Sequence, residues 1–225
     1  MPILKPIATR PASVTEMVQD AIREAIITRS LQPGDRVTEA GLARQLDVSK
    51  TPVREALLKL ECAGLIESDG GRGGRVVQPS PGSIRSAFEV RTALETQAAR
   101  LLAERGDREL VAASRKSATL CLEAAEHDDL GAFRDHDRRF HLGLAAATGN
   151  PLLERLIHDA FDLTWTLRNR EVPMMDDSLL CARQHVLAID AIEAGEADEA
   201  QTQMRAHIQT VLDLVITEFQ AQSDR

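Results

Sequence analysis

The sequence lacks any long hydrophobic run, and this absence excludes a membrane-spanning helix. No stretch approaches the roughly 20 consecutive apolar residues that crossing a bilayer requires. Residues 1–13 also lack the apolar core of about 7–15 residues that a secretory signal contains, so we expect the protein to remain in the cytoplasm. The composition, 43% hydrophobic and 28% charged, is typical of a globular protein.

Cysteine is scarce, and its spacing excludes a zinc site or a redox site built on a CxxC pair. The chain has three cysteines, an odd number, at Cys62, Cys121 and Cys181, and no two of them form a CxxC pair. We therefore expect reduced, structural thiols, which suit the cytosol.

The length and the distribution of charge indicate two domains. A chain of 225 residues is long enough for two hydrophobic cores. The net charge of −8 is uneven, because residues 1–78 carry 11 Lys and Arg against 10 Asp and Glu, whereas the remainder carries 16 against 25. A near-neutral module can still bind phosphates when its basic residues share one face, so the total charge does not exclude nucleic acid.

Helical periodicity and capping signals divide the first part of the chain into three helices. A capping-box pattern at Ser13–Glu16 begins the first helix. Thr38 can cap a second, short helix. The third begins around Ser49, has a proline in its first turn and stops at Gly64.

The segment after these helices predicts a β-hairpin. Two strand-like runs, 65–68 and 75–78, flank the glycine-rich segment 69–74, which carries Arg72 near its tip. Three helices and a hairpin make one compact domain over residues 10–78. Residues 79–83, rich in proline and serine, form a short linker.

The remainder of the chain, residues 84–221, has only helical periodicity. Glycine, proline, asparagine and aspartate mark the breaks between the predicted helices. The predicted helices span residues 84–104, 108–126, 130–147, 152–170, 177–194 and 198–220. The fold class is therefore mainly α, with the small N-terminal domain followed by an antiparallel all-α bundle of six or seven helices.

The third helix has the features of a DNA-recognition helix. Its apolar stripe of Val53, Leu57 and Leu60 leaves Lys50 and Arg54 on another face. Hydroxyl groups at the same end and the positive end of the helix dipole complete a set suited to phosphates and base edges. Arg72 could reach the minor groove or the backbone. The alternative is that the basic residues belong to an ordinary solvated helix face.

Four stretches resemble the winged helix of the GntR family over about residues 10–78. They are PGDRVTE (33–39), LARQL (42–46), VSKTPVREAL (48–57) and LECAGLI (60–66). The resemblance implies operator contacts from four residues of the third helix, Ser49, Lys50, Thr51 and Arg54. It also implies that the glycines of the wing allow a close approach to DNA. Ala40 stands where some members have an arginine, so that contact is absent or made by Arg44.

Four side chains of the helical part can converge on one metal ion. Asp137 and His141 are four residues apart on one helix, so they project from the same side. His185 and His207 lie on the apolar faces of two later helices, where a buried imidazole needs partners. One carboxylate and three imidazoles suit zinc, nickel or another borderline divalent cation. The alternatives are a surface hydrogen bond for the first pair and satisfied core histidines for the others.

The same residues carry a second resemblance, to the helical ligand-binding domain called FCD in the FadR subfamily of GntR regulators. It covers roughly residues 83–219 and rests on DRRFHLGL (137–144), GNP (149–151), QHVLAIDAI (184–192) and MRAHI (204–208). Metal-binding members use an aspartate and three histidines, which implies metal ligation by Asp137, His141, His185 and His207.

Arg91 is a candidate for binding an effector. It lies in EVRTALE (89–95), which is similar to the first helix of the FCD domain. One possibility is an exposed pair with Glu95, worth only a few tenths of a kcal/mol. The other is an inward guanidinium that forks onto a ligand carboxylate, and the resemblance, which implies organic-acid effectors, favours it. Arg168 is a weaker candidate of the same kind.

Together these features predict a homodimeric regulator of transcription, usually a repressor in this family, that binds a short inverted repeat in double-stranded DNA. We expect a small carboxylate effector at the metal and Arg91 to control DNA binding. The alternative is a metal-dependent hydrolase or lyase, because such a metal site can also activate water. In a third possibility the metal is purely structural.

Overall fold

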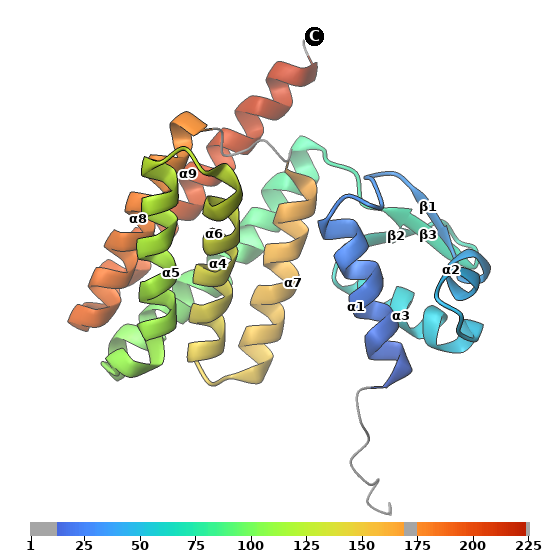
Figure 1. Ribbon diagram of the computed structural model, residues 1–225, viewed down its shortest axis with the longest axis horizontal. Helices are drawn as coiled ribbons and strands as arrows, with labels where there is room; N and C mark the ends of the chain where they lie inside the picture. The colour runs from blue at the N-terminus through green and yellow to red at the C-terminus, as the bar shows by residue number, and fades with distance from the viewer. Residues whose placement is uncertain (1–12, 169–174, 224–225) are drawn as a thin grey trace, which may run out of the picture. The chain divides into compact units, whose positions relative to one another are not determined.

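The computed structural model describes residues 13–168 and 175–223, which belong to two compact units that divide between Gln78 and Pro79 (Figure 1). The first unit contains three helices and a three-stranded antiparallel sheet. The helices are α1 (Val14–Ile27), α2 (Glu39–Gln45) and α3 (Lys50–Cys62), and the strands are β1 (Arg36–Thr38), β2 (Ile66–Ser68) and β3 (Gly73–Val76).

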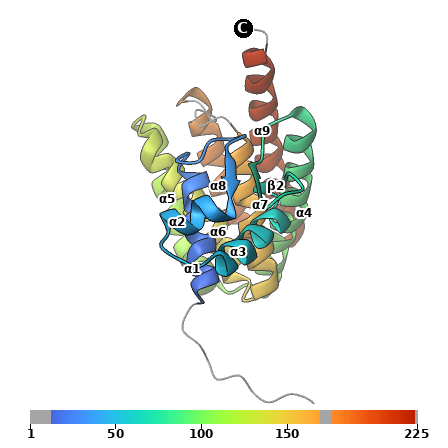
Figure 2. The ribbon, with the colours of Figure 1, turned by 90° about the vertical axis from the view of Figure 1, so that its right-hand side faces the viewer.

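Capping and burial explain the helices of the first unit. The Ser13 hydroxyl accepts from the Glu16 amide, and the Glu16 carboxylate accepts from the Ser13 amide, so the expected capping box begins α1. α1 packs against α3 (Figure 2). The apolar residues that α1 and α3 bury are Val18, Ile22 and Ile26 from α1 and Val53, Ala56, Leu57 and Leu60 from α3.

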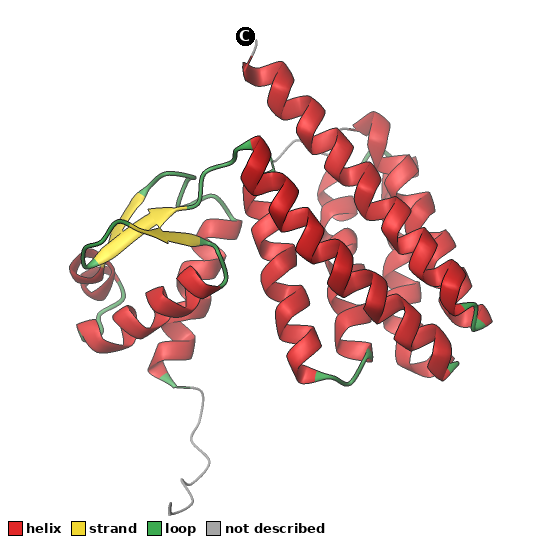
Figure 3. Cartoon of the chain, turned by 180° about the vertical axis from the view of Figure 1, so that it is seen from behind, coloured by secondary structure: helices red, strands yellow, loops and turns green. Residues whose placement is uncertain are grey.

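The sheet of the first unit has one strand more than the predicted hairpin. β1 pairs with β3, and the strand order is β1-β3-β2 (Figure 3). β1 has only three residues and one buried side chain, Val37, so no alternation signals it. β3 begins at Gly73, two residues before the predicted run. A Cβ on Gly73 would lie 2.1 Å from the Val37 carbonyl oxygen, and one on Gly74 would lie 2.5 Å from that of Glu67, so close pairing requires both glycines.

The second unit is a bundle in which helices that follow one another in the chain run in opposite directions (Figures 1 and 3). Short turns join most of them, which is typical of antiparallel bundles. The helices are α4 (Pro81–Arg105), α5 (Arg108–Glu126), α6 (Leu130–Ala147), α7 (Pro151–Leu167), α8 (Met175–Ala194) and α9 (Ala197–Ser223).

Three boundaries of the bundle differ from the prediction by three residues, and one of them is the end of α9, which extends to Ser223. α4 begins at Pro81, capped by the Ser80 hydroxyl, so residues 81–83 of the expected linker form its first turn. α7 ends at Leu167, and Arg168 already has an extended backbone. Residues 169 and 170, predicted as its last turn, lie outside the described part of the chain. The mainly helical architecture itself is confirmed.

Within the described residues, none of the helices combines the length and the apolar character that a bilayer span requires. The three cysteines are free, with Cys121 and Cys181 buried in the bundle and Cys62 exposed on α3. Burial raises the pKa of Cys181 to about 12 and that of Cys121 still further, so both remain thiols at neutral pH.

Candidate metal centre and DNA-binding surface

Three helices of the bundle bring Asp137, His141, His185 and His207 together in its interior. Asp137 and His141 lie one turn apart on α6, His185 lies on α8 and His207 on α9. One ligand atom from each lies within 4.8 Å of the others, and all four side chains are buried. The residues that the sequence indicates as metal ligands therefore form one cluster.

Four of the spacings within this cluster are those of neighbouring ligands on one metal ion. The Nε2 atom of His207 lies 3.2 Å from the Nε2 atoms of both His141 and His185. Asp137 Oδ1 lies 3.6 Å from His141 Nε2 and 3.5 Å from His185 Nε2. Ligand atoms about 2.0–2.1 Å from a zinc ion in tetrahedral geometry lie roughly 3.3–3.4 Å from one another. The donor set and these four distances therefore suit a borderline divalent cation, and all four ligand atoms lie within 4.8 Å of one another.

Electrostatics keep three of the four groups in the forms that bind metal, whereas the buried Glu95 of α4 raises the pKa of His141 against the effect of burial, so a metal ion would have to displace a proton there. Burial lowers the pKa of His185 to about 3, and burial and the neighbouring His185 lower that of His207 well below its usual value. Burial alone would raise the pKa of Asp137, but the neighbouring His141 and Arg168 hold it well below its usual range. Neutral imidazoles and an ionised carboxylate are the species that ligate metals.

A buried carboxylate, Glu95 of α4, contacts the outer nitrogen of one histidine of the cluster. Its Oε2 atom is 2.5 Å from His141 Nδ1, and its Oε1 atom is 2.5 Å from Arg91 Nε. Burial alone would raise the pKa of Glu95, but Arg91 and His141 lower it to about 2. The expected alternative of an exposed Arg91–Glu95 pair is therefore wrong, since both side chains are 3% exposed.

The two candidate effector-binding arginines lie beside this cluster. Arg91 stacks on Phe161, with its guanidinium carbon 4.6 Å from the ring centroid, and its Nη2 atom is buried without a hydrogen-bond partner among the described residues. Arg168 Nη2 lies 3.8 Å from Asp137 Oδ2. Burial lowers the pKa of Arg168 to about 10, which leaves it protonated at neutral pH. The site thus combines two buried cations with a metal-binding cluster.

The first unit presents the expected cationic surface at the start of α3. Ser49 is the N-cap residue, but its hydroxyl makes no capping hydrogen bond, and no acidic residue occupies the first turn. The first amides of the helix and the hydroxyl are therefore open to an anion. Lys50, Thr51 and Arg54 are exposed beside them, as is Arg44 at the end of α2.

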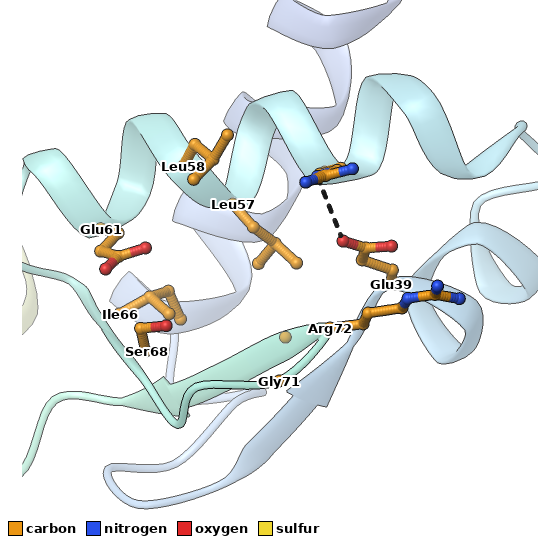
Figure 4. Close-up of a pocket in the computed structure, with 10 residues that line it drawn as sticks. Glu39, Leu57, Leu58, Glu61, Ile66, Ser68, Gly71 and Arg72 are labelled. Atoms are coloured by element: carbon orange, nitrogen blue, oxygen red, sulfur yellow. Dashed lines mark ion pairs between the residues drawn. The ribbon is translucent and has the colours of Figure 1, made fainter.

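A pocket of about 250 Å³ lies between α3 and the wing, which consists of β2, β3 and the loop between them. Glu39 is at the edge of this pocket (Figure 4). Arg54 Nε lies 3.8 Å from Glu39 Oε1, the ion pair drawn in Figure 4. The Arg72 carbonyl oxygen accepts a hydrogen bond from the Glu39 amide, which holds the exposed Arg72 close to α2. Arg72 is the last residue of the loop between β2 and β3, directly before Gly73, as the sequence predicts.

Family models match both units. The model "Bacterial regulatory proteins, gntR family" matches residues 14–76, and the model "FCD domain" matches residues 86–210, more than half of the chain. The chain belongs to the GntR family of transcription regulators. The resemblance seen in the sequence is confirmed. Because both families consist of regulators and not of enzymes, the alternative of a metal-dependent hydrolase or lyase is set aside.

Curated relatives of this GntR regulator match it along most of their length. The "Putative L-lactate dehydrogenase operon regulatory protein" of Escherichia coli strain K12 is 32% identical over an alignment of 230 positions, and the alignment covers 89% of this chain and 86% of the relative. The "HTH-type transcriptional repressor NanR" of Salmonella schwarzengrund is 28% identical over 230 residues, with 92% and 85% covered.

Solved structures share the fold of this GntR regulator. McbR/YncC from E. coli superposes with a TM-score of 0.74 at 20% identity and covers 93% of this chain and 100% of its own. A GntR-family regulator from Pseudomonas syringae pv. tomato has a TM-score of 0.54 at 26% identity, with 96% and 90% covered. The metal-free FCD domain of TM0439 covers 63% of this chain and 97% of its own, with a TM-score of 0.51 at 21% identity.

Two kinds of residue in this GntR regulator were not predicted from the sequence. Glu95 lies on the stripe Phe88–Arg91–Glu95–Ala98–Leu102, whose three-to-four spacing places it on the buried face of α4, and this spacing is the signal that could have found it. Arg36 and Arg75, paired across β1 and β3, add positive charge to the wing. Each is partly engaged, Arg36 with Asp69 at 3.2 Å and Arg75 with the Gly34 carbonyl oxygen at 3.1 Å.

Proposed function

We propose that this GntR-family regulator is a cytoplasmic repressor that binds its operator as a homodimer and is controlled by a small carboxylate bound beside a divalent metal ion. The observation that carries the proposal is the buried cluster of one aspartate and three histidines with the arginine Nη2 of Arg91 beside it. Zinc is the cation that the donor set favours, and nickel or another borderline divalent cation has the same ligand preference.

The chemistry of the site supports a carboxylate as the effector. A metal ion held by Asp137, His141, His185 and His207 would supply a Lewis-acidic position for a ligand oxygen or water. Arg91 offers a buried donor without an acceptor among the described residues, and an unsatisfied buried donor costs about 1–3 kcal/mol. A ligand carboxylate removes that cost, because a guanidinium forms paired hydrogen bonds with it. Arg168 adds a second buried cation beside Asp137.

The DNA-binding part of the proposal rests on the α3 surface and on symmetry. Ser49, Lys50, Thr51 and Arg54 would contact the operator from the start of α3, with Arg44 and Arg72 beside them. Two copies related by a two-fold axis would present two such surfaces, so the operator would be a short inverted repeat. The repressor sign agrees with the name of the relative NanR.

Control by the effector requires that the ligand bind one arrangement of the dimer better than another. We expect the carboxylate to lower operator affinity, as release of a repressor demands. Metal in a purely structural role is the competing account of the same cluster, and it makes a different prediction about chelation.

The experiment is a thermal-shift screen of small mono-, di- and tricarboxylic acids, carried out with zinc and with a chelator. L-lactate belongs in the panel because the name of one relative links it to the L-lactate dehydrogenase operon. A ligand of the folded state raises the melting temperature. We expect a carboxylate that does so only with metal present and that releases a fluorescent operator fragment.

The matched variants are Arg91→Lys and Arg85→Lys, both on α4, of which Arg85 is exposed. Lysine keeps the charge but loses the paired donor geometry, so only Arg91→Lys should diminish the shift. An equal shift with and without chelator would assign the metal a structural role. No shift with any carboxylate would refute the effector class.

A further inference from the structure

Glu95 occupies a position that links the metal cluster to the effector-binding arginine. It lies on α4, whereas the ring that it contacts, His141, lies on α6. Its two carboxylate oxygens are divided between two partners, with Oε2 on His141 Nδ1 and Oε1 on Arg91 Nε, each at 2.5 Å. The side chains of Glu95 and Arg91 are both 3% exposed, and that of His141 is fully buried.

The contact with His141 fixes which nitrogen of that ring carries a proton. A carboxylate only accepts hydrogen bonds, so Nδ1 must be the donor. In the neutral ring the lone pair then lies on Nε2, the atom that faces His207 at 3.2 Å and the centre of the cluster. A hydrogen bond from the outer nitrogen to a carboxylate sets the tautomer and the orientation of a metal-binding histidine and increases its basicity.

The other two histidines of the cluster have no such partner. The Nδ1 atoms of His185 and His207 are buried without a hydrogen bond to any described residue. Their rings pack against Phe140 and against each other, which restricts rotation but selects no tautomer. His141 is therefore the imidazole whose metal-binding form is selected by the fold, and Glu95 is the group that selects it.

We propose that Glu95 is the positioning residue of the metal centre. We also propose that, through its shared contact, metal binding changes the affinity of Arg91 for its ligand. The inference rests on the proposed function. A ligand carboxylate at Arg91 Nη2 acts on the same guanidinium whose Nε holds Glu95, and Glu95 in turn holds His141. Two sites joined by one carboxylate have a coupling free energy, which is reciprocal.

The test measures zinc affinity by competition with a fluorescent chelator, using the full-length protein. Glu95→Gln keeps the size of the side chain but removes its charge. Loss of such an outer partner typically costs about 10–100-fold in metal affinity, and we expect a loss in this range. Glu89→Gln is the matched control, because Glu89 lies on the same helix and is exposed, and its affinity should equal that of the unmodified protein.

A second variant guards against misfolding caused by an unpaired Arg91. Arg91→Met with Glu95→Leu replaces the buried pair by apolar side chains of similar volume, which proteins often tolerate. It has no acceptor for His141 Nδ1, so its zinc affinity should fall at least as far as that of Glu95→Gln.

A spectroscopic measurement separates positioning from a general structural effect. In zinc-loaded protein labelled with 15N-histidine, a proton on Nδ1 of a ring bonded to a carboxylate should give a resonance at unusually low field. We expect this resonance in the unmodified protein and in Glu89→Gln, and we expect it to be shifted or lost in Glu95→Gln.

The outcomes distinguish this inference from the proposed function. If the unmodified protein binds no zinc, the metal centre and the role of Glu95 both fail. If it binds zinc and both Glu95 variants bind zinc as tightly as the unmodified protein does, only the positioning role is overturned. Reduced affinity with an unchanged Nδ1–H resonance also overturns it, because the loss would then arise elsewhere.

Discussion

Asp162 is a buried carboxylate outside the metal centre, and it ties α7 to α6. Its Oδ1 atom accepts a hydrogen bond from Arg138 Nη1 at 2.6 Å, and its Oδ2 atom lies 3.1 Å from His158 Nδ1. Burial alone would raise its pKa, but His158 and Arg138 lower it to about 2. A carboxylate of this kind makes the stability of the bundle depend on pH.

We predict that Asp162→Asn lowers the free energy of unfolding by about 2 kcal/mol at pH 7, an estimate that follows from the shift of the pKa from roughly 4 in the unfolded chain. The folded pKa is depressed, so the stabilisation is complete above about pH 4 and is lost as the pH falls toward 2. Urea unfolding at pH 7 and near pH 2 measures the difference between the two proteins, which should shrink in acid.

The matched control is Asp135→Asn, which removes an exposed ion pair with Arg139 on α6. Exposed pairs contribute about 0–1 kcal/mol, so its effect should be small at either pH. A difference for Asp162→Asn that stays constant between the two pH values would mean that the charge of Asp162 is not the source of its contribution.

Among the metal ligands, His185 is the most informative to replace, because its ring is fully buried and comes from a helix that supplies no other member of the cluster. We predict that His185→Ala retains less than half of the metal that the unmodified protein holds, since three donors remain. Elemental analysis after dialysis measures the retained metal. His127→Ala, at an exposed histidine, should retain all of it, and full retention by His185→Ala would mean that the ligand set is different.

At the scale of elements, the start of α3 concentrates the groups that DNA requires. The side chain of Arg54 is 72% exposed, and its ion pair with Glu39 is long. Breaking this ion pair to form a contact with DNA therefore costs little free energy. Lys59 lies in the last turn of the same helix and provides an equal charge far from the first turn.

We predict that Arg54→Ala weakens operator binding by about 1–3 kcal/mol if Arg54 contacts a base, whereas loss of a phosphate contact lowers the salt slope by about one. Fluorescence anisotropy with an operator fragment at several salt concentrations measures both quantities. Lys59→Ala should change neither. If Arg54→Ala and Lys59→Ala bind the operator with equal affinity, the DNA-binding surface does not include this part of α3.

The elements differ in how well the sequence predicts them, and the reason is the number of residues that carry the signal. α5 and α6 each have at least 18 residues with a helical apolar period and a capping aspartate, and their predicted bounds match the structure. β1 has three residues, and its existence depends on Gly73 and Gly74, which lie far along the chain. Local periodicity contains no information about such pairing.

The candidate metal centre was predictable in composition but not in its surroundings. Spacing four apart and placement on apolar faces indicate Asp137, His141, His185 and His207. Glu95 was not indicated, because its spacing can place it on the buried face of α4 but cannot show which side chain of another helix it meets. Only the packing of α4 against α6 shows that its carboxylate faces His141.

At the scale of the whole molecule, two units with separate cores need not unfold together. The candidate metal cluster lies entirely within the bundle, so metal bound there stabilises the bundle directly. The single tryptophan, Trp165, lies on α7, stacked on Phe161 and covered by Arg168, so its fluorescence reports the bundle alone.

We predict that a chelator lowers the melting temperature seen by tryptophan fluorescence while a second transition, seen by circular dichroism and belonging to the winged helix, stays in place. Metal at about 100 times its dissociation constant contributes about 2.7 kcal/mol, and 1 kcal/mol shifts the melting temperature of a domain of this size by about 2–4 °C, so the expected decrease is roughly 5–10 °C. In His185→Ala the chelator should have no effect. If both transitions fell together in the unmodified protein, the two units would be coupled in unfolding. If neither moved, the four buried ligands would bind no metal that contributes to stability, and the cluster would be a packing feature of the bundle.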